Sequence, residues 1–266
     1  MTPSGGAQLV ALSVESFRDA VRRRVAVALA ALSLLSLLVV DSCTSCGSSV
    51  VTMNGVDVDA SRFFGMTGVA LYAVLALWVI AIAGALASDH LQQALEDGTA
   101  HLTLARPVGR GVFALARLAG ALAVSLGTGA VLLGGAALFL RFRYDLPLLP
   151  AVAAAAVAAV SSIAVGSLAM SASLYLPRFA TLVLVFLGVI CIAAANFYAL
   201  SGAELGAVWG SLDRFAPPIG TGIALAAAEW VGRELPASPL LVAARLALWA
   251  AFGPALLAFL FRRREI

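Results

Sequence analysis

Long apolar segments separated by short polar ones dominate this chain. Six of them are candidates to cross a bilayer, at residues 25–40, 64–87, 118–140, 151–176, 179–200 and 240–261. A hydrocarbon core of about 30 Å needs roughly 20 apolar residues of helix. Leu, Ala and Val fill these segments without the alternation of barrel strands, so we expect helices. The pattern predicts an all-α integral membrane protein with six transmembrane helices in one domain, residues 1–266.

Three shorter segments predict helices that do not cross. In residues 12–24 the apolar side chains fall on one helical stripe, formed by Val14, Phe17 and Val21. This pattern is typical of an amphipathic helix at the membrane interface, and the alternative is a charged flank. Segments 203–212 and 218–231 are too short to cross, while Trp209 and Trp230 suit an interface. We expect short re-entrant or interfacial helices before the last span, against the alternative of a surface loop.

The composition limits what such a bundle can do alone. With 62% hydrophobic residues and a mean hydropathy of +1.02, the chain belongs in a bilayer. We expect no ionisable residue inside the spans, which excludes a proton relay and a voltage sensor. All 17 basic residues are Arg, so the Lys that a P-loop requires is absent. We therefore predict passive membrane machinery that takes its energy from a partner, with no cofactor and no ATPase activity of its own, rather than an enzyme.

The arginines also predict the orientation. Six spans put both termini on one side, which then holds eleven arginines against six on the other: Arg18, Arg22, Arg23, Arg24, Arg106, Arg110, Arg117, Arg178, Arg262, Arg263 and Arg264 against Arg62, Arg141, Arg143, Arg214, Arg233 and Arg245. The positive-inside rule places the first set in the cytoplasm. The basic charge then reflects topology and requires no nucleic acid. The first span reads as a retained signal-anchor, and the Ala, Gly and Arg richness suggests a bacterial inner membrane.

Cysteine and histidine offer little chemistry. Cys43 and Cys46 follow the first span on the predicted outer side, where a disulfide, two inert thiols or a functional pair are all open. His90 and His101 lie 11 residues apart without the spacing of a metal site. We expect both to be solvated helix residues, and we predict no metal site and no catalytic residue.

The loop between the second and third spans is the most informative segment. Leu91, Ala94 and Leu95 share one helical face, and Gly98 follows as a residue that ends a helix at positive φ. Thr99 suits the cap of a second short helix that Pro107 closes. The sequence predicts two short helices with a sharp break, suited to docking another protein. A solvated loop with helix caps is the alternative.

These residues resemble a known signature. The run Glu96-Asp97-Gly98-Thr99, followed by Leu104-Ala105-Arg106-Pro107-Val108 and Arg110, is similar to the E-x-G-T … L-x-x-P-V-x-R motif of ABC transporter permeases of the type-2 export class. The motif lies in the expected loop of six spans. The resemblance implies that Glu96, Asp97, Gly98 and Thr99 belong to a coupling element held by a separate ATP-binding subunit. Arg106, Pro107 and Arg110 would shape the return into the third span.

The resemblance implies partners as well. The complex would contain two permeases, identical or paralogous, and two ATP-binding subunits, and ATP-driven closure would push on the coupling helices. The chain would form the translocation path of an exporter in contact with membrane lipid. A membrane scaffold or assembly subunit that moves nothing is the alternative, because charge-free spans suit it equally.

Overall fold

A computed structural model describes residues 5–22, 50–53, 56–105, 108–202, 204, 206–232 and 235–263. The predicted first span, 25–40, lies outside the described residues, as do Cys43 and Cys46. Arg106 and Pro107 of the predicted coupling element lie outside them too.

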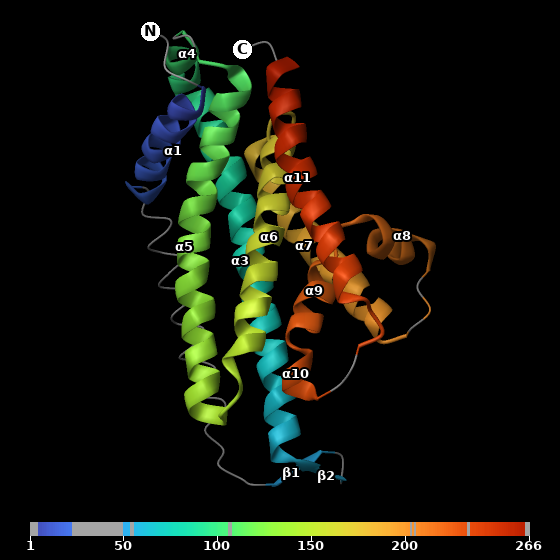
Figure 1. Ribbon diagram of the computed structural model, residues 1–266. Helices are drawn as coiled ribbons and strands as arrows, with labels where there is room; N and C mark the ends of the chain where they lie inside the picture. Colours follow the sequence, from blue (N-terminus) through green and yellow to red (C-terminus); the bar gives the residue numbers. More distant parts are fainter. Residues whose placement is uncertain are drawn as a thin grey trace.

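Five helices in the described part of the chain are long and apolar enough to cross a membrane. They are α3 (Ala60–Glu96), α5 (Arg110–Tyr144), α6 (Leu148–Ala172), α7 (Arg178–Leu200) and α11 (Pro239–Arg263). Figure 1 shows them side by side in one elongated bundle. Each matches a predicted span, which confirms a multi-pass helical membrane protein. The helices α3 and α5 continue well beyond the apolar segments. In α3, residues 88–96 are largely polar and include no Gly or Pro, so the helix continues past its apolar segment.

Short elements mark the two ends of the bundle. At one end, called the α4 end, lie α1 (Gly5–Arg22), α4 (Thr99–Leu104) and the last turn of α11 (Figure 1). At the other, called the hairpin end, β1 (Val50–Met53) pairs antiparallel with β2 (Val56–Asp59). The register joins Val50 to Asp59 and Met53 to Val56, on either side of residues 54–55. The hydrophobic pattern of the sequence did not predict these strands.

The helices α3 and α6 form the centre of the bundle. Small residues allow close packing there, as at Gly166, where an added Cβ would lie 3.2 Å from Leu122 and 3.6 Å from Ala83. Towards the hairpin end, the Tyr72 and Trp230 rings meet edge to face at 5.6 Å, and Trp230 Nε1 donates to Pro147 O at 2.9 Å. Trp230 is only 6% exposed, so its side chain packs inside the protein, whereas an interfacial position was expected.

The helix α1 lies against α5 with its apolar stripe facing outward. Val10, Val14, Phe17 and Val21 are 41–62% exposed, while Ser16 is 2% exposed. A Cβ added at Gly120 of α5 would lie 2.3 Å from Ser16 Oγ and 2.8 Å from its carbonyl carbon. Only glycine allows this approach. The helix therefore presents the predicted stripe to its surroundings and packs its small polar side on the bundle.

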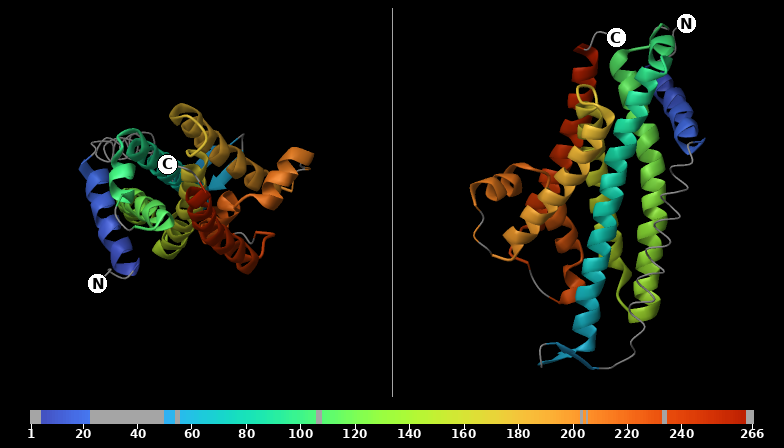
Figure 2. Two further views of the ribbon diagram at one scale, coloured as in Figure 1. Left: turned by 90° about the horizontal axis from the view of Figure 1, so that it is seen from above. Right: turned by 180° about the vertical axis from the view of Figure 1, so that it is seen from behind.

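The segment before α11 forms α8 (Ala207–Phe215), α9 (Ile219–Ala226) and α10 (Ala228–Val231). The helix α9 is buried among α6, α7 and α11, whereas α8 has no buried residue. Figures 1 and 2 show α8 projecting sideways from the middle of the bundle, on the side away from α1. It also runs across the bundle axis rather than along it.

Two polar residues hold α8 in this position. Asn196 of α7 is fully buried; its Nδ2 donates to Asp213 Oδ1 at 2.7 Å and its Oδ1 accepts from Gly220 N at 3.0 Å. Arg245 of α11 donates to the carbonyl oxygens of Asp213, Arg214 and Ala216 at 2.7–2.9 Å. These acceptors lie at the C-terminal end of α8, where helical carbonyls lack partners. The expectation of charge-free spans is therefore wrong for 240–261, because Arg245 lies within it.

Candidate coupling surface at the α3–α4 turn

The helix α3 ends just before Gly98, where the sequence predicted a break, but the first of the two predicted short helices is the continuation of α3 rather than a separate helix. Asp97 N still donates to Gln93 O at 2.9 Å. Gly98 then adopts a φ of +70°, a backbone conformation that residues other than glycine rarely adopt. No heavy atom lies within 4 Å of a Cβ added at Gly98, so backbone conformation alone selects glycine here. Glu96 and Asp97 are exposed beside this turn. The acids therefore lie at the tip of a helix that continues unbroken through the bundle.

The helix α4 follows at once and is tied back to α3. Thr99 is its first residue, and the Thr99 hydroxyl donates to Ala94 O at 3.2 Å. The expected cap would instead accept a backbone N–H, so the structure corrects the role of this hydroxyl. Thr103 Oγ1 donates to Thr99 O at 2.8 Å inside α4. Arg110 is exposed and begins α5, so the turn lies between two continuous spans.

A buried polar cluster joins α1, α3 and α5 beside the turn. His90 is 3% exposed, and its Nε2 lies 2.7 Å from Ser16 Oγ and 3.2 Å from Arg117 Nη1. Arg117 also pairs with Asp19 at 3.1 Å. The guanidinium can only donate, so His90 Nε2 accepts in this arrangement. The expectation that His90 is solvated is wrong, because these partners bury it. They lie 74 and 27 residues away in sequence, so the local pattern could not indicate them.

The other side of α3 contacts the turn between α6 and α7. Gln92 Nε2 donates to Leu176 O at 2.7 Å and to Ser173 O at 3.2 Å. Asp89 forms an ion pair with Arg178, the first residue of α7. A displacement of the last turns of α3 would therefore act on α1, α5, α6 and α7 together.

A cavity of about 600 Å³ opens between α1, α4 and α5. Its polar wall includes Glu15, Arg18, Thr99 and Thr103, and Phe113 lies at its apolar side. Both acidic and basic side chains line it, so it presents charged and hydrogen-bonding groups. Among the described residues, no group of three or more His, Cys, Asp and Glu could hold a metal ion.

No protein-family model matches the chain, and no curated protein matches it in a sequence comparison.

Proposed function

We propose that this chain is the membrane-spanning permease subunit of an ATP-driven ABC exporter of the type-2 class. A separate ATP-binding subunit would hold the α3–α4 turn, and the permease itself would form the translocation path. The observation that carries the proposal is the exposed pair Glu96 and Asp97 at a glycine-dependent turn between two continuous spans. A helix transmits a push along its axis because every backbone hydrogen bond lies within it.

The contacts around the turn support the same mechanism. The cavity between α1, α4 and α5 lies beside the acids and could receive side chains of the partner. The buried cluster of Ser16, His90 and Arg117 and the Gln92 contacts link the end of α3 to its neighbours. Movement at the turn would therefore become a concerted tilt of helices rather than the bending of a loop.

The proposal includes six spans, with both termini in the cytoplasm of a bacterial inner membrane. The helix α1 lies beside the part of α5 near the α4 end, and β1 lies at the hairpin end. In the proposal, the apolar segment 25–40 between them is the sixth crossing. The exposed stripe of α1 would lie in the cytoplasmic interface, and α8, α9 and α10 would enter the membrane from the outer side.

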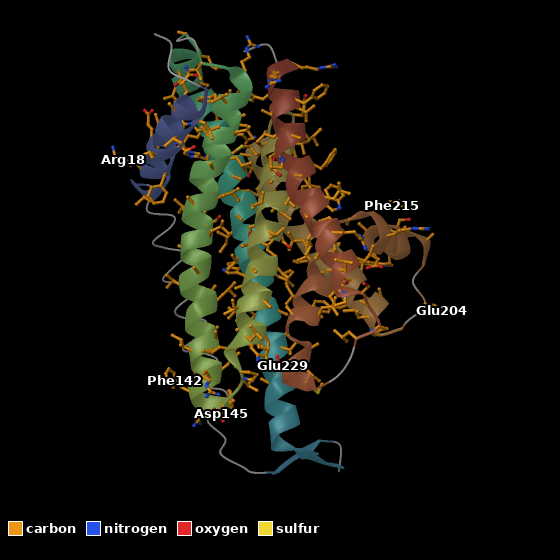
Figure 3. The ribbon with its side chains drawn as sticks, viewed as in Figure 1. Arg18, Phe142, Asp145, Glu204, Phe215 and Glu229 are labelled. Atoms are coloured by element: carbon orange, nitrogen blue, oxygen red, sulfur yellow. The ribbon has the colours of Figure 1, made fainter. Side chains whose placement is uncertain are left out.

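Co-purification tests the proposal. The tagged full-length chain, extracted from its native membrane in mild detergent, should carry a nucleotide-binding protein and ATPase activity. Glu96→Ala should reduce the bound partner about tenfold, the effect of losing about 1.4 kcal/mol at an interface. Glu229→Ala is the matched control, because Glu229 is an exposed glutamate on α10, far from the turn (Figure 3).

Substitutions at the turn test the role of its conformation. Gly98→Pro should abolish partner binding while membrane insertion persists, because proline fixes φ near −65°. Gly98→Asn should retain binding, since asparagine tolerates the left-handed region. Purification of the chain without any ATPase would refute the proposal and leave the membrane-scaffold alternative.

A further inference from the structure

The exposed apolar stripe of α11 ends in two arginines. Leu248, Phe252 and Phe259 are 68%, 48% and 49% exposed, and α11 is the least buried of the five described spans. At about 100° per residue, these three side chains lie on one face of the helix. Arg262 and Arg263, both exposed, lie within about 60° of Phe259 on the same face. The apolar face of α11 therefore leads directly to two positive charges.

The length of this stripe matches one leaflet of a bilayer. Leu248 and Phe259 are 11 residues apart, which corresponds to about 17 Å along a helix. Half of a hydrocarbon core of about 30 Å is about 15 Å. An acyl chain packed along the stripe therefore places the phosphate of its lipid about one helical turn beyond Phe259, at the level of the two arginines.

Contacts within the protein fix the positions of both guanidinium groups. The central carbon of the Arg263 guanidinium lies 4.4 Å from the centre of the Phe259 ring, which is a cation–π contact. Arg262 reaches the first turn of α5, where a Cβ added at Gly111 would lie 2.9 Å from Arg262 Nε and 3.4 Å from its Nη2. Figure 1 shows the end of α11 beside the start of α5 at the α4 end. The two charges therefore lie on either side of the stripe.

The charge around these arginines is positive. Neither arginine forms an ion pair with an acid in the described part of the chain. The first turn of α5 contains no acid and begins with a third arginine, Arg110. In the sequence, Arg264 adds a further positive charge before the single acid Glu265. A headgroup with a net negative charge complements this group of arginines, whereas a zwitterionic headgroup leaves positive charge unbalanced.

We infer that an anionic phospholipid binds at this end of α11, with its phosphate between Arg262 and Arg263. One of its acyl chains lies along Leu248, Phe252 and Phe259. The guanidinium groups donate hydrogen bonds to the phosphate oxygens, and the net negative charge selects this lipid over zwitterionic neighbours. This site goes beyond the proposed function and does not depend on an ATP-binding partner.

Photolabelling by lipid tests the site locally. The purified full-length chain is placed in vesicles of phosphatidylcholine and phosphatidylethanolamine that contain a trace of phosphatidylglycerol with a photoreactive acyl chain. Mass spectrometry then measures labelling of α11 peptides. Arg262→Gln combined with Arg263→Gln should lower this labelling about tenfold or more, because each basic residue near the surface contributes about fivefold to the binding of an anionic lipid. Arg141→Gln combined with Arg143→Gln is the matched control, because it removes the same charge from the last turn of α5 at the hairpin end. Labelling of α11 in this control should match the unaltered chain.

Two comparisons separate a headgroup site from general contact with lipid. Phosphatidylethanolamine with the same photoreactive chain should label α11 of the unaltered chain as weakly as phosphatidylglycerol labels the glutamine variant. Arg262→Lys combined with Arg263→Lys should keep most of the labelling, because it retains both charges. Equal labelling by the two lipids, unchanged labelling of the glutamine variant or an equal loss in the control overturns the inference. Co-purified ATPase activity is measured separately, so its presence without lipid selectivity leaves the proposed function intact.

Discussion

The close approach of α1 to α5 at Gly120 allows a quantitative test of how α1 is held. Gly120→Ala adds a Cβ 2.8 Å from the Ser16 carbonyl carbon, which no side-chain rotation can move. Ordinary contact begins at 3.4–4 Å, so α1 must shift by about 0.6 to 1.2 Å. A shift of this size takes the 2.7 Å distance from Ser16 to His90 to about 3.3 Å or more, beyond a good hydrogen bond.

The expected energy follows from two contributions. Overpacking costs about 1–3 kcal/mol and the loss of a buried hydrogen bond about 1–3 kcal/mol. Replacing glycine with alanine inside a helix also stabilises α5 by up to about 1 kcal/mol. Gly127→Ala provides that gain alone, because nothing lies within 4 Å of a Cβ added there. Because that gain is common to both variants, the difference between them is about 2–6 kcal/mol.

Amide hydrogen exchange, measured by mass spectrometry, reports this energy difference for the peptides of α1. Peptides from α1 should lose protection about 30-fold or more in Gly120→Ala, since 1.36 kcal/mol corresponds to tenfold. Protection of α1 in Gly127→Ala should match the unaltered chain. Equal protection of α1 in the two variants would refute the conclusion that the Ser16–Gly120 contact holds α1 on the bundle.

Two further predictions concern the supports of α8. Asn196→Leu should lower the free energy of unfolding in mixed micelles by about 1–3 kcal/mol, because it leaves the buried Gly220 N–H without its acceptor. Thr128→Val should change little, because the Thr128 hydroxyl bonds only carbonyls of its own helix; equal effects would contradict the assignment. Arg245→Ala should speed amide exchange in α8 about tenfold, and Arg245→Lys should retain part of the protection. Unchanged exchange in Arg245→Ala would show that α8 is held without these bonds.

The sequence predicted those features that depend on neighbouring residues. The five described spans follow from runs of apolar residues, and the break after Asp97 follows from Gly98, whose φ of +70° is a local backbone property. The end of α3 at Glu96 rather than near residue 87 shows that polarity marks the end of a membrane segment but not of a helix.

The remaining features depend on contacts distant in the chain. Ser16 and Arg117 bury His90, and no local pattern indicates that three segments meet there. Arg245 reads as a flanking charge until α8 is seen to end beside it. The Thr99 hydroxyl bonds back to α3 because the Gly98 turn brings α4 close to Ala94. In each case tertiary packing supplied a partner that spacing could not reveal.

Photo-crosslinking from position 97 tests the central proposal most directly, because it reports what touches the α3–α4 turn in the membrane. A photoreactive residue in place of Asp97 should capture a nucleotide-binding protein, identified by mass spectrometry. The same residue in place of Asp145, an exposed aspartate at the hairpin end (Figure 3), should not. Capture of that protein from position 145 alone, or of no protein from position 97, would contradict the account.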